Sequence, residues 1–210
     1  MIIEWNNRKW SWNPIDKNLL SVNDWTYDFN KALPHIENKR VAVQAGGAMG
    51  LWPYLLSQHF DKVYTFEASI ENYIHLEKNL KDVENIEYCN KALGEKNTMC
   101  LTKLHKDESN NAGCYYTKES EDGNIQQVKI DDVVEGPVDF IQLDIEGHEL
   151  GALKGAKNTI EKYWPVIMVE DKALPHSQEI NHKVGYLEKE LTSIGYEVVA
   201  RIHRDIIFKK

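Results

Sequence analysis

Residues 40–50 read RVAVQAGGAMG, a short apolar run followed by three glycines. An apolar run of this length that ends in glycines is typical of a buried strand, and residues 51–59 then favour a helix. Glycine adopts positive φ angles and lets the backbone approach a ligand closely, so Gly46, Gly47 and Gly50 suit a ligand-binding turn. A tight structural turn is the alternative at this point.

The chain on either side of this turn alternates short apolar runs with stretches of helical period. Further strands are expected at 62–67, 86–90, 99–104, 126–130, 138–144 and 166–170, and helices at 71–80, 149–163 and 184–194. A last pair of runs, 196–200 and 205–208, predicts an antiparallel hairpin. Strands that alternate with helices form βαβ units. The sequence therefore predicts an α/β, Rossmann-like fold with a central, mostly parallel sheet, helices on both faces and an antiparallel C-terminal hairpin.

The two ends of the predicted domain differ in character. Residues 1–35 hold tryptophans among polar residues without a clean period, followed by a helix that Pro34 would end. We predict that 1–35 form an irregular arm and a helix that cap the main domain, 36–210. The polar stretch 105–124 is long for a compact domain and predicts a functional loop.

An acidic residue follows the glycine turn at the spacing that is typical of a ribose-binding acid in this kind of fold. Glu67 ends the second expected strand, about 20 residues after the turn, where a carboxylate accepts hydrogen bonds from a ribose diol in folds of this kind. Asn90 and Ala92 end the third strand, where an adenine ring would lie, and both are candidates for contacts with its edge. Turn, spacing and acid together predict a site for an adenosine-type cofactor.

The glycine spacing separates two kinds of adenosine cofactor. Dinucleotide enzymes favour G-x-G-x-x-G, whose helix N-terminus faces a pyrophosphate. Residues 45–50 read AGGAMG instead, which suits a cofactor without a pyrophosphate and favours S-adenosylmethionine. A nicotinamide-dependent oxidoreductase is the less favoured alternative.

The second half of the chain carries a more specific pattern. Residues 138–149 read VDFIQLDIEGHE and 153–156 read LKGA, and this combination resembles the signature of FkbM-family methyltransferases. Residues 66–73 (FEASIENY), 90–94 (NKALG) and 131–133 (DDV) resemble further family segments. The resemblance spans about residues 40–171. It implies a class I, Rossmann-like methyltransferase fold, S-adenosylmethionine as cofactor, and O-methylation of a hydroxyl of a carbohydrate or a related small molecule.

The resemblance also assigns residues. It implies that Gly46, Gly50, Glu67 and Asp144 belong to the cofactor or reaction site. One departure concerns Gln44, because the family usually has an acid there, and glutamine carries no charge for the methionine ammonium. Gln44 therefore motivates the alternative of a catalytically silent, cofactor-binding or partner-binding domain. The candidate cofactor contacts are Gln44, Gly46, Gly47, Gly50, Leu51, Glu67, Ala68, Asn90, Ala92 and Asp144.

Methyl transfer to a hydroxyl requires in-line geometry and removal of the hydroxyl proton. Asp144, at the end of its expected strand, is the candidate general base or acceptor-orienting group. His148 is the second candidate because the ordinary histidine pKa lies nearest neutrality, with a surface histidine as the alternative. Glu149 is expected to serve the dipole of the helix that begins there.

We predict no resident metal. The alternative is a divalent cation held through oxygen ligands, since carboxylates cluster at the ends of two neighbouring strands. The carboxylates of that set are Asp144, Glu146, Glu170 and Asp171.

Composition limits the partners. The formal net charge of −8 and the pI of about 5.5 disfavour long nucleic acid and anionic membranes as partners. The start of the chain lacks a signal-type apolar segment, and no apolar run reaches the roughly 18 residues of a membrane span. Cys89, Cys100 and Cys114 have no metal-ligand spacing and indicate free thiols. We expect a cytoplasmic protein that acts on a small-molecule or glycan acceptor.

Overall fold

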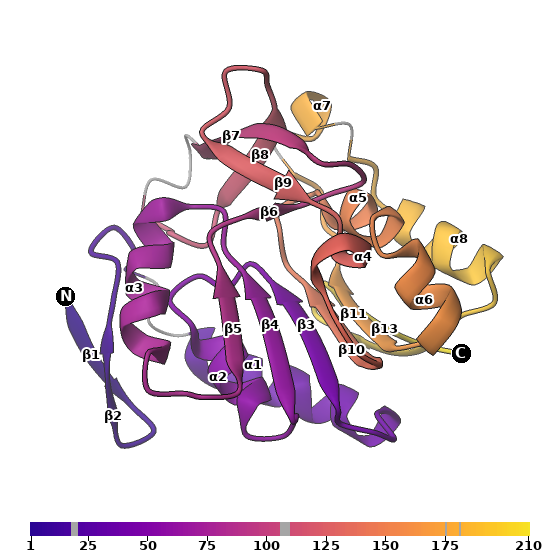
Figure 1. Cartoon of the computed structure of the whole chain (residues 1–210), viewed down its shortest axis with the longest axis horizontal. Helices are drawn as coiled ribbons and strands as arrows, with labels where there is room; N and C mark the ends of the chain where they lie inside the picture. Colours follow the sequence, from indigo (N-terminus) through magenta and orange to yellow (C-terminus); the bar gives the residue numbers. More distant parts are fainter. Residues whose placement is uncertain (18–20, 106–109, 175, 181) are drawn as a thin grey trace.

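The computed structural model describes residues 1–17, 21–105, 110–174, 176–180 and 182–210. Its central sheet contains β3 (Val41–Ala45), β4 (Lys62–Phe66), β5 (Ile86–Cys89), β10 (Val138–Leu143), β11 (Val166–Glu170), β12 (Glu197–Ile202) and β13 (Asp205–Lys209). The strand order is β12-β13-β11-β10-β3-β4-β5 (Figure 1). The five strands from β11 to β5 run parallel, and β13 pairs antiparallel with both β11 and β12. The predicted α/β fold with its C-terminal hairpin is confirmed.

Helices cover both faces of this sheet. One face carries α1 (Ser21–Ala32), α2 (Leu51–Ser57) and α3 (Ile70–Leu80), and the other carries α4 (Ile130–Val133), α5 (Glu149–Lys154), α6 (Lys157–Tyr163) and α8 (Tyr186–Ser193). Successive side chains of a strand point to opposite faces, so Val43 packs in one core and Ala42 in the other. Within the described part of the chain, no helix is both long and apolar enough to cross a membrane.

The expected helix 149–163 is two helices, and the prediction of one is wrong. The break falls at Gly155, where a Cβ would lie 2.1 Å from the carbonyl oxygen of Gly94. Only glycine permits this approach of the two backbones, and α6 then starts in a new direction. Two more elements are short: η1 (Leu33–His35), which holds Pro34, and α7 (Ser177–Ile180).

A second, four-stranded sheet lies beyond the C-terminal ends of the parallel strands (Figure 1). Its strands are β6 (Ala92–Leu93), β7 (Thr98–Leu104), β8 (Tyr115–Glu119) and β9 (Ile125–Val128), in the order β6-β9-β7-β8. The prediction of a polar loop over 105–124 is wrong at β8, which pairs antiparallel with β7. The polar residues of β8 hide the strand pattern in the sequence. Residues 106–109 of that stretch lie outside the described residues.

The N-terminal arm begins with a hairpin of β1 (Ile2–Trp5) and β2 (Arg8–Ser11), so the expectation of an irregular arm is wrong there. The turn consists of Asn6 and Asn7, whose φ angles are 49° and 58°. Asparagine tolerates this left-handed region, and two such residues in succession suit a two-residue hairpin turn.

The hairpin packs against the start of α2. Trp10 and Trp12 are fully buried and contact Met49 and Leu51. The Asn79 side chain from α3 accepts from the backbone N–H of Ser11 at 2.7 Å and donates to the backbone oxygens of Ser11 and Met49, both at 2.8 Å. The arm is thereby attached to the glycine turn that precedes α2.

The aromatic core under α1 and α2 gives a first test. Phe140 on β10 is fully buried, and its ring centroid lies 6.0 Å from those of Phe29 and Phe60. We expect Phe140→Ala to lower the free energy of unfolding by about 3–5 kcal/mol, because it removes buried area and leaves a cavity. The matched control is Ile74→Ala on the exposed side of α3, which should change it by under about 0.5 kcal/mol. Equal effects in urea denaturation would contradict this packing.

Candidate functional site

A pocket opens where the parallel strands end, between the central sheet and β8. Its lining brings together seven of the predicted site residues: Gly46, Gly47, Glu67, Ala68, Ala92, Asp144 and His148. In parallel sheets, ligands bind at the carboxyl ends of the strands, which is where this pocket lies.

The glycine turn forms the floor of the pocket. The backbone N–H groups of Gly46 and Gly47 both donate to the carbonyl oxygen of Phe66, at 3.0 and 3.1 Å. Gly46 has φ +81°, and a Cβ there would lie 1.9 Å from the carbonyl oxygen of Asp144. Glycine at position 46 is required both by its backbone angle and by this contact with the end of β10.

Glu67 connects two loops of the pocket. One carboxylate oxygen accepts from the backbone N–H of Ala48 and the other from that of Ser69, both at 2.7 Å. The pKa of Glu67 is raised to about 7, because burial and, to a smaller extent, Asp144 outweigh the opposing hydrogen bonds from the two backbone N–H groups and Asn72. Ala48 has φ 44°, in the left-handed region, so this hydrogen bond also holds an unfavourable backbone conformation in the turn.

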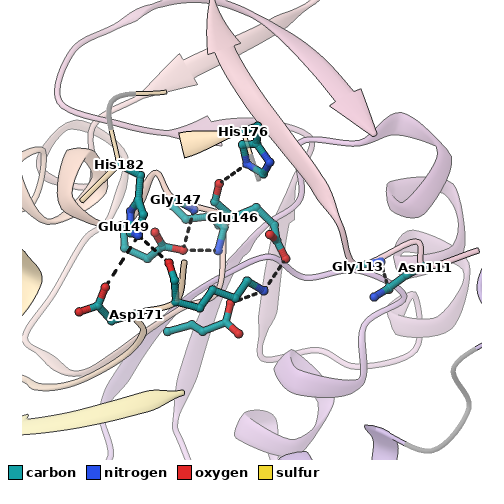
Figure 2. A network of polar contacts seen from close by, with 11 residues as sticks. Asn111, Gly113, Glu146, Gly147, Glu149, Asp171, His176 and His182 are labelled. Atoms are coloured by element: carbon teal, nitrogen blue, oxygen red, sulfur yellow. Dashed lines mark hydrogen bonds and ion pairs between the residues drawn. The ribbon is translucent and has the colours of Figure 1, made fainter. Parts of the chain in front are cut away.

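The segment after β10 forms a sharply bent loop. Glu146 and Gly147 have φ angles of 54° and 97°, and a Cβ on Gly147 would lie 2.3 Å from the Ile180 side chain. The Glu149 side chain reaches back to this loop and accepts from the N–H groups of Ile145 and Gly147, at 2.9 and 3.2 Å (Figure 2). Burial raises the pKa of Glu149 to about 8, so the carboxyl group is mainly protonated at neutral pH.

The two candidate bases differ in environment. The backbone N–H of Asp144 donates to the Ala45 carbonyl at 3.1 Å, which fixes its backbone beside the glycine turn, while its side chain stays partly exposed to the pocket. Burial lowers the pKa of His148 to about 4, and its Nδ1 has no hydrogen-bond partner among the described residues. His148 is therefore an uncharged, weakly basic imidazole at neutral pH.

The predicted carboxylate set comes together only in part. Oxygens of Asp144, Glu146 and Glu170 lie within 4.8 Å of one another. The fourth member, Asp171, instead accepts a hydrogen bond from the N–H of Gly185 at 2.8 Å. Sequence reasoning missed Lys172, whose ammonium lies 2.9 Å from Glu146 Oε1 and 2.6 Å from Glu170 Oε2. In the sequence, the only feature that could have pointed to Lys172 is its position directly after the acids Glu170 and Asp171.

Four predicted cofactor contacts do not line the pocket. Gln44 is fully buried under the turn, and its Oε1 accepts from the Thr65 hydroxyl. Gly50 and Leu51 begin α2, and Leu51 packs against the N-terminal hairpin. Asn90 donates from its amide to the Glu67 carbonyl at 2.8 Å, so it holds the end of β4.

The pocket also has walls formed by residues outside the predicted set of cofactor contacts. They come from α2, α3, β8 and the loops after β5 and β10, and the residues are Trp52, Asn72, Lys91, Tyr115, Thr117 and Ile145. Asn72, Lys91 and Ile145 lie within segments that resemble the family, whereas the place of Tyr115 and Thr117 depends on how the second sheet covers the first.

The chain is similar to known proteins in sequence and in fold. The model of the methyltransferase FkbM domain matches residues 54–198. No curated protein matches the chain. A crystal structure of methyltransferase FkbM from Methylobacillus flagellatus KT shares 21% identity with a TM-score of 0.56. The match covers 82% of this chain and 44% of that one, so the chain spans less than half of that relative.

Two further structures match along nearly their whole length. A putative methyltransferase from Streptococcus mutans, in complex with SAH, shares 13% identity with a TM-score of 0.54, over 88% of this chain and 97% of that one. A SAM-dependent methyltransferase from Aquifex aeolicus shares 13% identity with a TM-score of 0.52, over 92% and 93% of the two chains. These likenesses show the fold.

The buried carboxyl of Glu149 predicts a pH-dependent stability. Its pKa of about 8 in the folded protein exceeds the ordinary value of 4.5. The stabilisation is therefore complete below the unfolded pKa and is lost as pH rises through about 8. We expect Glu149→Gln, an isostere of the protonated acid that keeps Oε1, to flatten the decline between about pH 5 and pH 8, by up to about 1.4 kcal/mol per pH unit.

Urea denaturation at a series of pH values measures this slope. Glu84→Gln, at an exposed position, is the control and should leave the slope unchanged. Identical slopes for wild type and Glu149→Gln would show that Glu149 is ionised in the folded protein.

Proposed function

Because the chain belongs to the FkbM family of S-adenosylmethionine-dependent methyltransferases, we propose that it transfers the methyl group to a hydroxyl oxygen of a carbohydrate or a related small molecule. One observation carries the proposal. The glycine turn and the loop after β10, the two motifs of the sequence, meet in one pocket with Glu67 and Asp144 in its lining. A cofactor floor and a candidate base are thus side by side.

The pocket fits the cofactor on the chemistry of its lining. Gly46 and Gly47 leave the floor without side chains, and Phe66, Ala68 and Ala92 supply apolar surface for a flat ring. Glu67 already accepts two backbone N–H groups, but a carboxylate has about four acceptor positions and so retains capacity for ribose hydroxyls.

We assign the removal of the hydroxyl proton and the orientation of the acceptor to residues that follow β10. When bound, S-adenosylmethionine supplies a methyl group made electrophilic by its sulfonium. Asp144 is proposed to accept the proton of the acceptor hydroxyl, which makes its oxygen a better nucleophile. His148, uncharged because its pKa is about 4, is proposed to orient the acceptor by a hydrogen bond rather than to act as the base.

Two alternatives carry less support. The alternative of a catalytically silent domain rests on Gln44, but the Gln44 side chain lies beneath the pocket and outside its lining, so its lack of charge leaves the lining unchanged. A nicotinamide-dependent oxidoreductase requires a pyrophosphate site, and residues 45–50 lack the G-x-G-x-x-G pattern.

The partner and the location are part of the same proposal. The net charge of −8 supports a small-molecule or glycan acceptor rather than long nucleic acid. Among the described residues, Cys89, Cys100 and Cys114 form no disulfide, which supports action in the cytoplasm.

The cofactor assignment is tested at Glu67. We expect Glu67→Ala to weaken S-adenosylmethionine binding by about 10-fold or more, because the carboxyl acceptor for the ribose hydroxyls is lost. Glu77→Ala, at an exposed position on α3, is the control and should bind as the wild type does. Isothermal titration calorimetry measures both affinities. An unchanged affinity in Glu67→Ala would remove the ribose assignment.

The reaction is tested at Asp144. We expect Asp144→Asn to reduce turnover by about 100-fold or more, because asparagine cannot accept the proton, while S-adenosylmethionine affinity changes little. The assay incubates the enzyme with S-adenosylmethionine and a panel of sugars and small alcohols, and identifies the methyl ether by mass spectrometry. Turnover equal to wild type would exclude Asp144 as the base. Methylation at nitrogen or carbon alone would overturn the hydroxyl assignment.

A further inference from the structure

Three carboxylates and one ammonium form a compact group beside the pocket. Asp144 and Glu146 follow β10, and Glu170 and Lys172 lie at the end of β11. The three carboxylates lie within 4.8 Å of one another, and the Lys172 ammonium donates to Glu146 and Glu170. Side chains of Glu146, Glu170 and Lys172 are only 7%, 14% and 18% exposed, so water screens their charges weakly.

The backbone on both sides of this group is fixed. The carbonyl of Lys172 accepts from His182 Nε2 at 2.9 Å, and the carbonyl of Glu146 accepts from His176 Nε2 at 3.1 Å (Figure 2). Since a carbonyl oxygen only accepts, each Nε2 carries a hydrogen. The ammonium and its carboxylate partner are therefore held in place by their own backbones as well as by their charges.

Three carboxylates this close together require a cation or protons. Like charges at such distances repel strongly when partly buried, and proteins relieve this repulsion with a metal ion, an ammonium or protonation. Burial and Asp144 raise the pKa of Glu170, whereas Lys172 lowers it. Burial alone would lower the pKa of Lys172, but the three acids outweigh it and raise the pKa, so the ammonium stays charged.

We propose that Lys172 is a built-in cation that takes the place of a divalent metal among Asp144, Glu146 and Glu170. A divalent ion would need the same carboxylate oxygens, and two of them already accept from the ammonium. Lys172 is then a positioning residue: it acts on Asp144 through charge and holds Glu146 and Glu170 in ion pairs. Together with the proposed function, this implies a methyl transfer that needs no metal.

Divalent-cation binding to the cofactor-free protein tests this idea without relying on methyltransferase activity. The variant Lys172→Met removes the ammonium charge and keeps an unbranched side chain. The three carboxylates are then available to a divalent cation that prefers oxygen ligands. With about 10 mM MnCl₂ and a Kd of about 0.1 mM, its melting temperature should rise by about 5–10 °C. Untagged wild type and Lys172→Arg should show no rise.

Lys154→Met is the matched control, because it removes a lysine from an exposed ion pair, Lys154 with Glu95, at 3.7 Å. It should show no cation-dependent rise. The double variant Lys172→Met with Glu170→Gln should lose most of the rise, which places the ion among these carboxylates. If Lys172→Met does not fold alone, Lys172→Gln is titrated in the same way, and folding restored by the cation supports the proposal.

Two results would overturn the proposal. A wild-type protein that is stabilised by MnCl₂ as strongly as Lys172→Met would show that Lys172 does not exclude the metal. Neutral variants at 172 that gain no cation response would show that the ammonium only supports the fold. If the cation response appears but no methyl transfer is found, the proposed function fails and the built-in cation stands.

Discussion

The contact between Gly46 and the carbonyl oxygen of Asp144 is the constraint on which the site depends. A side chain at position 46 would place its Cβ 1.9 Å from that oxygen, so the turn after β3 and the end of β10 meet only if residue 46 is glycine. The N–H of Asp144 donates to Ala45 on the other side of the same junction. The floor of the pocket and its candidate base are therefore fixed relative to each other by backbone atoms.

Two buried glutamates hold the loops around this junction. Glu67 accepts from the N–H groups of Ala48 and Ser69, and Glu149 accepts from those of Ile145 and Gly147. Both loops contain a non-glycine residue in the left-handed region, Ala48 in one and Glu146 in the other, so each glutamate satisfies the backbone of a strained turn. Each of these two acids therefore stabilises the fold of its loop whether or not a ligand is bound. Burial raises the pKa of both carboxyls, which links loop geometry to pH.

The sequence predicts most of the central sheet because its strands are short apolar runs between clear turn signals. It predicts the pocket floor because the glycine turn is combined with an acid about 20 residues later, at the end of the next strand. It fails where tertiary contacts override local pattern. β8 is polar and becomes a strand by pairing with β7, while the helix after β10 breaks at Gly155 because the Gly94 backbone lies against it. The hairpin of β1 and β2 turns at two asparagines with left-handed backbone angles. Its strands show no regular alternation of apolar and polar residues that would predict them from the sequence.

The structure shows where the negative charge of the site lies. The family acid of the first strand is Gln44 here, and it lies under the pocket in a hydrogen bond with Thr65. Negative charge is gathered at the ends of β10 and β11, on Asp144, Glu146 and Glu170, around the Lys172 ammonium. A sulfonium cofactor becomes a neutral thioether once its methyl group leaves. In the proposed function, Lys172 partly neutralises these carboxylates and so limits how far their charge would favour the cationic cofactor over its neutral product.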